Sequence, residues 1–405
     1  MHSLAVTTLI LIGSALPGAD PAAVKSEFVF PLRTEHNHAP GIVECPNGDL
    51  LASWYRGSGE RKSDDVAVFG ARLKKGESTW GETFLVADNP EFPDCNTTMM
   101  IDRNQKLWVF WPVIIDNNWE SALTNFRVSS DYQSDGAPKW ERDGVIYLKP
   151  ADFKEPALKE LEGLMKSAPP QLVEYFTRKG GYFDEFKKRL DSKLYQRLGW
   201  QPRCKPTILP SGRILLPLYS DTFSYGLMAV SDDDGQHWYA SKPLIGMGAI
   251  QPTVVRRNDG TLVAYSRENG PKKKIRVCES TDDGINWGPV GVIDLPNPGA
   301  GIDCVRLENG HWVMIYNDAE RGRNTLAVTI SEDEGKTWTK TRHLEQHKDG
   351  AYHYPAIIQG KDGTIHAIYS YFSPDALGPG KEGKTMKHAA FTEAWIAAGD
   401  EKKPQ

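Results

Sequence analysis

The sequence predicts an all-β fold, a six-bladed β-propeller with a helical insertion between blades two and three. Two internal repeats carry this prediction. The first is a turn of the form Ser-x-Asp-x-Gly-x-x-Trp, which occurs three times at steps of roughly fifty residues, at Ser231–Trp238, Ser280–Trp287 and Ser331–Trp338. The second is a hairpin pattern that occurs six times. Because four-stranded antiparallel units repeated around an axis form a propeller, six hairpins predict six blades.

Each hairpin pattern has a short apolar strand, a turn rich in Gly, Asn or Asp, and a second strand of alternating apolar residues. The turns with their second strands are Pro46–Trp54, Asp102–Trp111, Pro210–Tyr219, Asn258–Ser266, Glu308–Tyr316 and Lys361–Ser370. Asn-Gly and Asp-Gly pairs predict tight turns in which both central residues take a positive φ. A third strand follows, and the Ser-x-Asp-x-Gly-x-x-Trp turn leads into a fourth.

The Ser-x-Asp-x-Gly-x-x-Trp turn is interpreted as a folding device at a blade corner. Its Asp carboxylate can accept backbone N–H groups, its Gly permits a sharp bend, and its Trp can pack between neighbouring sheets. Degenerate copies end at Trp80 and Trp140. The motif is therefore expected to stabilise the fold rather than to act on a ligand.

The ring is expected to close through the two ends of the domain, which we place at residues 25–397. The strand Phe28–Leu32 would pair with Met386–Phe391 as the outer strand of the last blade. Between Trp140 and Cys204 the apolar residues recur at spacings of three and four residues, which predicts two or three helices over about 150–200. These helices could cover one face as a lid or pack as a decoration. Residues 398–405 are expected to form a disordered tail.

The two ends and the composition set broad limits. Residues 1–24 contain an apolar run before small residues, which indicates a leader peptide and a secreted or periplasmic protein. The five cysteines are an odd number without a CxxC pair, and we expect them to be small buried hydrophobes. The net charge of −5 shows no basic excess, so neither nucleic acid nor a membrane is an expected partner.

Polar residues gather where a propeller would bring them to the hub, just before the first strand of a blade or just after the second. Those before first strands include His38, Asn96, Arg203, Lys205, Gln251, Asp303, His353 and Tyr354. Those after second strands are Arg56, Glu60, Asp64, Asp65, Asp221, Arg267, Asn317 and Arg323. Guanidinium groups hold carboxylates in a bidentate fashion, so this set suits an anionic sugar of a glycan. Asp221 and Asn317 could equally be hairpin caps.

No cofactor is expected, and no metal site. The sequence has no HExxH motif, and His36 and His38 lie too close in one strand to share a simple site.

The repeated turns, the six hairpins and the hub pattern resemble the sialidase (neuraminidase) superfamily, in its broad BNR-repeat branch. This resemblance covers nearly the whole chain outside the leader, the insertion and the tail. It implies that Arg267 and Arg323 are two of three arginines that hold a substrate carboxylate. It also implies that Tyr354 is the catalytic nucleophile, with Tyr352 as the second candidate, and that Asp64 or Asp65 is the acid/base. Glu60, Arg56, Arg203, Asn317 and Asp221 are further candidates for substrate binding.

Two positions depart from the family's pattern. The family's first arginine is matched by His38, and the glutamate that activates the tyrosine is matched by Gln251. A neutral amide cannot take the phenol proton, so Tyr354 would be a poorer nucleophile. His38 could instead move a proton to a leaving oxygen or from a sugar carbon, or it could brace the first blade.

Three functions follow as hypotheses. The leading one is an exo-acting glycosidase that releases a terminal acidic sugar of sialic acid or uronate type. The alternatives are a uronate lyase or other glycosidase that uses His38, and a propeller that binds glycans without turnover.

Overall fold

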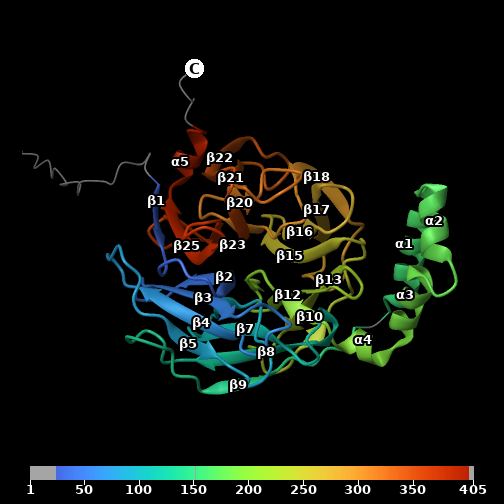
Figure 1. Cartoon of the computed structure of the whole chain (residues 1–405), viewed down its shortest axis with the longest axis horizontal. Coiled ribbons are helices and arrows are strands. Elements are labelled where there is room, and N and C mark those ends of the chain that lie inside the picture. Colours follow the sequence, from blue (N-terminus) through green and yellow to red (C-terminus); the bar gives the residue numbers. More distant parts are fainter. Residues whose placement is uncertain (1–23, 151, 401–405) are drawn as a thin grey trace, which may run out of the picture.

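The computed structural model describes residues 24–150 and 152–400, and these form a ring of six antiparallel sheets (Figure 1). Blade one contains β2 (His36–Glu44), β3 (Leu50–Gly57), β4 (Ala67–Leu73) and β5 (Phe84–Ala87). Blade two contains β6 (Thr98–Ile101), β7 (Leu107–Ile114), β8 (Ala122–Ser129) and β9 (Arg142–Val145), with the short helix η1 (Trp119–Ser121) between β7 and β8. Blade three contains β10 (Trp200–Pro202), β11 (Thr207–Ile208), β12 (Ile214–Ser220), β13 (Tyr225–Ser231) and β14 (Tyr239–Ala240).

The second half of the chain repeats the same order of strands. Blade four contains β15 (Ala249–Arg256), β16 (Leu262–Glu268), β17 (Lys274–Ser280) and β18 (Gly291–Pro296). Blade five contains β19 (Asp303–Arg306), β20 (Trp312–Tyr316), β21 (Thr325–Ser331) and β22 (Lys340–Gln346). Blade six contains β23 (Ala351–Gln359), β24 (Ile365–Ser373), β25 (Gly383–Phe391) and β1 (Lys25–Phe28), and the short helix α5 (Glu393–Ala397) follows it. The predicted six-bladed propeller is confirmed.

The six hairpin turns share one geometry, which differs from the one predicted. In blade one, Gly48 N donates to Cys45 O, and Cys45 N donates to Asp49 O. The loop therefore has three residues, and only its last one, Gly48, takes a positive φ, of 90°. Five further loops repeat this pattern, and in blade two Gln105 takes the glycine's place with φ 58°. The expectation of two positive φ angles was wrong, because a three-residue loop reverses the chain with one left-handed residue.

The Ser-x-Asp-x-Gly-x-x-Trp turns are structural, as expected. In the first copy, Ser231 Oγ donates to Asp233 Oδ1 at 2.9 Å, and the same oxygen accepts the backbone N–H of His237 at 2.9 Å. The hydrogen bonds from His237 hold the pKa of Asp233 at about 2. Trp238 packs into the core between blades two and three, and Trp338 does the same between blades four and five. The motif thus fixes each blade corner and fills the gap between blades.

The ring closes between its first and last strands, as predicted, but four residues of the predicted strand lie outside it. β1 pairs with β25 from Lys25↔Ala390 to Phe28↔Lys387. Val29 and Phe30 are buried in the core between blades six and one, and Pro31 has no N–H for a ladder. The strand therefore lies nearer to the N-terminus than its apolar residues indicate. The expected leader, 1–24, lies outside the described residues except for Val24.

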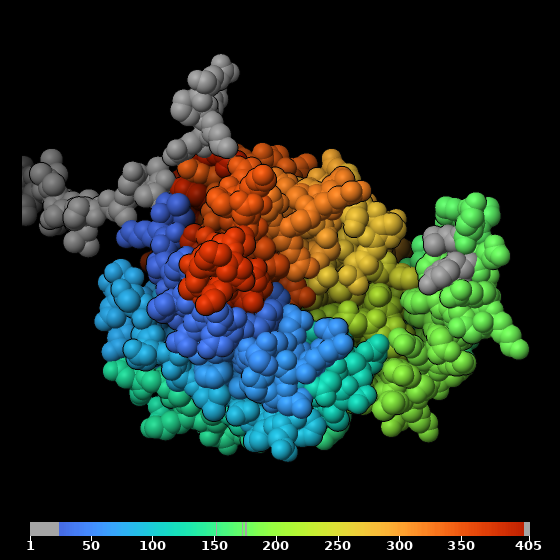
Figure 2. Space-filling model, viewed as in Figure 1, coloured from blue at the N-terminus to red at the C-terminus, as the bar shows by residue number. Residues whose placement is uncertain are grey.

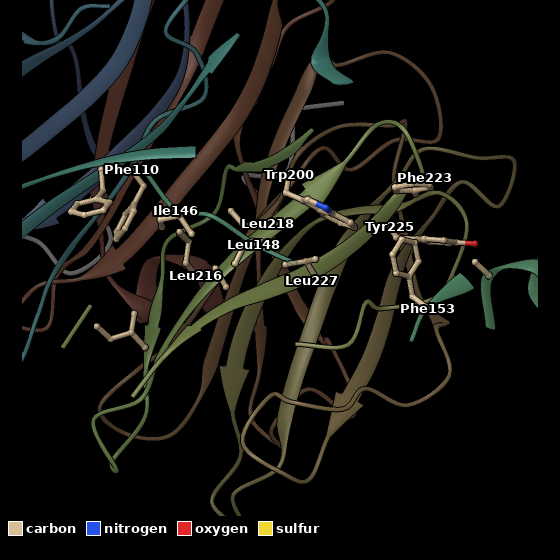
Figure 3. Packing of buried hydrophobic residues seen from close by; sticks show 14 of the residues in the cluster. Phe110, Ile146, Leu148, Phe153, Trp200, Leu216, Leu218, Phe223, Tyr225 and Leu227 are labelled. Carbon is tan, nitrogen blue, oxygen red and sulfur yellow. The ribbon is translucent and has the colours of Figure 1, made fainter. Parts of the chain in front are cut away.

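The insertion forms helices α1 (Lys154–Ser167), α2 (Pro170–Thr177), α3 (Tyr182–Asp191) and α4 (Lys193–Arg197). Figures 1 and 2 show α1 to α3 as a lobe at the margin of the ring, away from its centre. The lobe is anchored by an apolar cluster that includes Phe153, Phe223 and Tyr225 (Figure 3). Tyr225 also donates through its hydroxyl to Glu160 Oε2 at 2.7 Å. The insertion is therefore packed against the outer part of blade three.

Three further features are the cysteines, the C-terminal residues and the length of the helices. All five cysteines are buried and free, as expected. Part of the expected tail is ordered, because Asp400 accepts hydrogen bonds from the backbone and the ring of His343. Within the described residues, no helix has the length and apolar character needed to span a bilayer.

Candidate functional site

A small polar pocket of about 130 Å³ lies where five of the six blades converge. Its lining residues come from the strand ends that the sequence analysis singled out, on blades one, two, three, four and six. They are Tyr55, Glu60, Asn96, Trp119, Tyr219, Asp221, Gln251, Arg267 and Tyr354. Side chains 299 residues apart in the chain, Tyr55 and Tyr354, therefore share one cavity, as a closed ring of blades requires.

A repeated backbone irregularity aims side chains at this pocket. Ala39, Gln251 and Tyr354 each precede a proline and take a positive φ, of 53°, 57° and 47°. At each of them the register of the innermost strand shifts against its neighbour. A bulge turns a side chain out of the regular alternation of a strand. Blades four and six use it to present Gln251 and Tyr354 to the pocket.

The phenol of Tyr354 lies at the centre of the site. Gln251 Nε2 donates to its oxygen at 3.1 Å, and Arg267 Nη1 donates to it at 3.0 Å. No carboxylate contacts this oxygen among the described residues. The phenol oxygen therefore receives two N–H groups, and its own proton remains available to a ligand.

Three arginines surround Tyr354. The guanidinium carbons of Arg203, Arg267 and Arg323 lie 5.3, 6.0 and 5.9 Å from the centroid of its ring. Across residues 24–150 and 152–400, no carboxylate forms an ion pair with any of them. Buried charges in proteins are normally paired, so this cluster has an excess of positive charge.

The three arginines differ in their hydrogen-bond partners and in their position relative to the pocket. Arg203 is buried and donates to the carbonyls of Ile302, at 2.9 Å, and Pro355. Arg323 donates to Gly299 O at 2.7 Å and contacts His353 Nδ1 at 2.8 Å. Burial lowers the pKa of the Arg323 guanidinium. Only Arg267 lines the pocket itself, and its Nε has no partner in the described structure.

His38 lies behind Tyr354 rather than in the pocket. The centroids of the two rings are 4.4 Å apart, and His38 Nδ1 contacts Ser370 Oγ at 2.9 Å. Burial, together with the charges of His353, His36 and the arginines, lowers the pKa of His38 well below its usual value. The histidine is therefore neutral at ordinary pH, and it fixes the orientation of the tyrosine ring.

Two carboxyl groups line the pocket in contrasting environments. Burial raises the pKa of Asp221 to about 6, although Arg267 opposes this. Burial also acts on Glu60, but hydrogen bonds from His36 and Tyr55 outweigh it and lower the pKa of that carboxyl. Tyr55 donates to Glu60 Oε1 at 3.0 Å, and Gln201 Nε2 donates to Asp221 Oδ2 at 3.2 Å. Carboxyl groups whose pKa values are pushed apart can serve as acid and base.

Besides His38, Arg203 and Arg323, four further candidate residues do not line the pocket. Asp64 accepts from Asn117 Nδ2 at 2.7 Å, and Asp65 accepts from the backbone and hydroxyl of Ser58. Both carboxylates thus brace the loop that carries Glu60.

Arg56 and Asn317 are turned away as well. Arg56 lies over Phe30 and Phe69, with its guanidinium carbon 4.9 and 4.5 Å from their centroids, because it alternates with Tyr55 along β3. Asn317 is fully buried and donates to Tyr352 O at 3.1 Å, which links blades five and six.

The site also contains residues that are absent from the candidates for chemistry. Tyr55 and Tyr219 lie inside apolar strands, where a tyrosine is interpreted as a core residue. Trp119 lies in the loop after β7, a position equivalent to that of Glu60 in blade one, and this equivalence could have revealed it. Asn96, by contrast, was expected at the hub as a polar residue before a first strand, and it lines the pocket and donates to Tyr219 OH at 3.2 Å.

Comparisons with known proteins agree with this architecture. A BNR repeat-like domain model matches residues 191–367. A sialidase of Micromonospora viridifaciens is 23% identical over 396 residues, which cover 94% of this chain and 55% of that protein. The chain thus spans about half the length of this relative.

Solved structures show the same fold at low identity. The leech intramolecular trans-sialidase, complexed with 2,7-anhydro-Neu5Ac, matches with a TM-score of 0.66 at 11% identity, covering 95% of this chain and 72% of that one. A mutant of NanB sialidase from Streptococcus pneumoniae matches with a TM-score of 0.65 at 13% identity, covering 95% of this chain and 72% of that one. A protein of unknown function from Dyadobacter fermentans matches with a TM-score of 0.63 at 15% identity, covering 91% of this chain and 99% of that one.

The chain contains a BNR-repeat domain and is a distant homologue of sialidases. At these identities the structural neighbours establish the fold alone. One of them, of almost the same extent as this BNR-repeat propeller, has no assigned function. The chemistry of the pocket therefore depends on its own residues.

Proposed function

We propose that this propeller is an exo-acting glycoside hydrolase that binds a terminal acidic sugar in the hub pocket. The observation that carries the proposal is the cluster of Arg203, Arg267 and Arg323 around Tyr354, without a carboxylate partner in the described residues. A ligand carboxylate would supply the missing negative charge, and Arg267 is the guanidinium that can reach it. The leech structure, which holds the acidic sugar 2,7-anhydro-Neu5Ac, adds support from a protein of the same fold.

The size of the pocket supports action at a chain end. Sites that enclose drug-sized ligands have volumes of about 300–1,000 Å³, whereas this pocket has about 130 Å³. It can enclose much of one sugar ring but not two. The proposed substrate therefore places only its terminal unit in the hub.

Asp221 and Glu60 provide the acid and the base of this proposal. Below about pH 6 the carboxyl of Asp221 keeps its proton and can donate it to the glycosidic oxygen as the C–O bond breaks. The carboxylate of Glu60 can accept a proton from the water that attacks the anomeric carbon. Tyr354 donates a hydrogen bond from its phenol to the bound sugar and so orients the sugar. These roles replace those expected for Asp64 and Asp65.

One specific observation favours a second candidate, a propeller that binds acidic glycans without turnover. The amide of Gln251 contacts the phenol of Tyr354 at 3.1 Å, so no base is in place to activate a tyrosine nucleophile. Eliminative cleavage by His38 receives no such support, because that ring packs behind Tyr354 and does not line the pocket.

A substrate screen separates these candidates. The purified protein is incubated with α-sialosides and with glycans that end in glucuronate or galacturonate. Released sugars are measured, along with the ultraviolet absorbance of the double bond in an unsaturated uronate. We expect a free acidic monosaccharide and no unsaturated product. Binding without release would support the second candidate, and an absorbance rise would support a lyase.

A further inference from the structure

We propose that the helical insertion builds a second binding site, for the anionic chain of a polysaccharide whose terminal sugar occupies the hub pocket. The site is a groove between α4 and the strand ends of blade two, which we call the insertion groove. Its walls are Leu123, Leu148, Leu194 and Leu198, and basic side chains flank it. The inference extends the proposed function, and it rests on that function for the position of the chain end.

The first observation is the volume and character of the groove. It encloses about 620 Å³, several times the volume of the hub pocket. Tyr147 and Leu194 stand out along it with 76% and 59% of their surfaces exposed. An exposed aromatic ring beside aliphatic walls is a surface on which the apolar face of a sugar can stack.

The second observation is charge. Lys149, Lys193 and Arg197 flank the groove and are exposed. Within the described part of the chain, none of these side chains has an ion-pair or hydrogen-bond partner. The whole protein carries a net charge of −5, so three unpartnered cations around one apolar groove are a local exception. They complement a ligand that combines sugar rings with carboxylate or sulfate groups.

The third observation is continuity with the hub. The helix η1 separates the hub pocket from a further hollow of about 470 Å³, with Trp119 on the hub side and Glu120 and Ser121 on the other. That hollow shares Leu194 and Leu198 with the insertion groove. Three residues of a 3₁₀-helix rise about 6 Å, which is close to the length of one sugar unit.

The geometry also orients the chain. The strand ends that carry Leu123 and Tyr147 lie on the same face of the propeller as Trp119, because β8 begins and β9 ends there. An ion pair of 3.6 Å between Arg189 of α3 and Glu120 ties the insertion to η1. A glycan that leaves the hub over Trp119 therefore meets the groove within a few sugar units. The insertion thus acts as the wall of an extended site at the margin of the ring.

The test compares ligands of increasing length. Binding of galacturonate oligomers with one to eight units is measured by calorimetry, beside a heparin-derived octasaccharide and maltooctaose as the sulfated and neutral probes. Affinity is expected to rise with length for at least one anionic series and not for the neutral one. The triple variant Lys149→Ser, Lys193→Ser, Arg197→Ser should lose roughly tenfold or more of the affinity for the anionic octamer.

A matched control removes three exposed lysines away from the groove, with Lys242→Ser, Lys336→Ser and Lys348→Ser. It has the same change in net charge and should keep the affinity for the octamer. Equal losses in both triple variants, or affinity that does not depend on length, would overturn the inference. Binding of the wild type to vesicles with phosphatidylserine, without binding to either anionic series, would overturn it too.

The two proposals can fail separately. Length-dependent binding that the groove variant abolishes, without release of any sugar, would retain the groove and reject the hydrolase. Turnover of short acidic glycosides with no effect of length would retain the hydrolase and reject the groove.

Discussion

Gln251 Nε2 lies 3.1 Å from the hydroxyl of Tyr354, and this amide stands where a base would be needed to make the phenol a nucleophile. The same phenol accepts a second hydrogen bond, from Arg267. In the proposed function, the tyrosine therefore donates a hydrogen bond and forms no covalent intermediate. The proposed acid and base are then Asp221 and Glu60.

Replacement of the amide tests this assignment. In Gln251→Glu the new carboxylate would pair with Arg267, whose Nη1 lies 3.5 Å from the amide oxygen. Since Arg267 would then be occupied, affinity for an acidic sugar should fall, by roughly tenfold or more. Gln251→Ala serves as the control that removes the amide without adding charge. A gain in turnover with a covalent adduct on Tyr354 in the glutamate variant would contradict the assignment.

The pH dependence should follow Asp221. A general acid must be protonated, so kcat/KM should fall as pH rises through about 6, the pKa that burial gives this carboxyl. Asp221→Asn should lower the rate by about 10² to 10⁴ and remove this fall. A pH profile unchanged in the variant would exclude Asp221 as the acid.

The same variant has a readout that does not require turnover. The folded-state pKa of Asp221 is raised, so its contribution to stability is present at low pH and is lost as pH rises through about 6. Relative to wild type, Asp221→Asn should therefore gain up to ~2 kcal/mol in the free energy of unfolding between pH 4 and pH 8. Denaturant titrations at both pH values measure this difference.

Lysine substitutions at three arginine positions should weaken the binding of an acidic sugar in a fixed order. Arg267 lines the pocket, Arg323 lies behind it, and Arg321 is an exposed neighbour. Lysine keeps the charge but loses the planar fork, so affinity for an acidic sugar should fall most in Arg267→Lys and less in Arg323→Lys. Arg321→Lys is the matched control and should bind as wild type. The reverse order, found by calorimetry, would refute the placement of the carboxylate.

The end of the chain provides a test of stability away from the site. A hydrogen bond that the His343 ring donates to Asp318 raises the pKa of His343 to about 9, with burial opposing this shift and Asp400 aiding it. Its contribution is fully present below pH 6.5 and is lost as pH rises through about 9. Because Asp400 is half exposed, we expect only ~1 kcal/mol. His343→Gln should lose this amount at pH 6 and nothing at pH 10, as measured by unfolding, and equal effects at both would contradict the model.

Much of the fold could be predicted because it is repeated. Six copies of one hairpin and three copies of one turn identify the propeller even where a single copy, such as that at Asp102–Trp111, lacks glycine. The turn geometry could not be predicted as well, because an Asn-Gly pair is compatible with loops of two or three residues. β1 was misplaced because Val29 and Phe30 are as apolar as strand residues but fill the core between blades.

The site could be predicted by position but not by side-chain direction. The expectation that polar residues at the ends of the inner strands meet at the hub brings Gln251, Arg267 and Tyr354 together correctly. It cannot tell which of Tyr55 and Arg56 faces the hub, because neighbours on a strand point to opposite sides. It also cannot distinguish Glu60, which enters the pocket, from Asp65, which caps its own loop. Such choices depend on contacts between blades that are distant in sequence.

The central claim is that the hub recognises a carboxylate. The most direct test is titration calorimetry of N-acetylneuraminic acid and galacturonic acid against their methyl esters, at a pH where the acids are ionised. We predict that at least one acid binds and that its ester, which keeps the ring but lacks the charge, binds at least roughly tenfold more weakly. Equal affinity for acid and ester, or no affinity for either acid, would contradict the account.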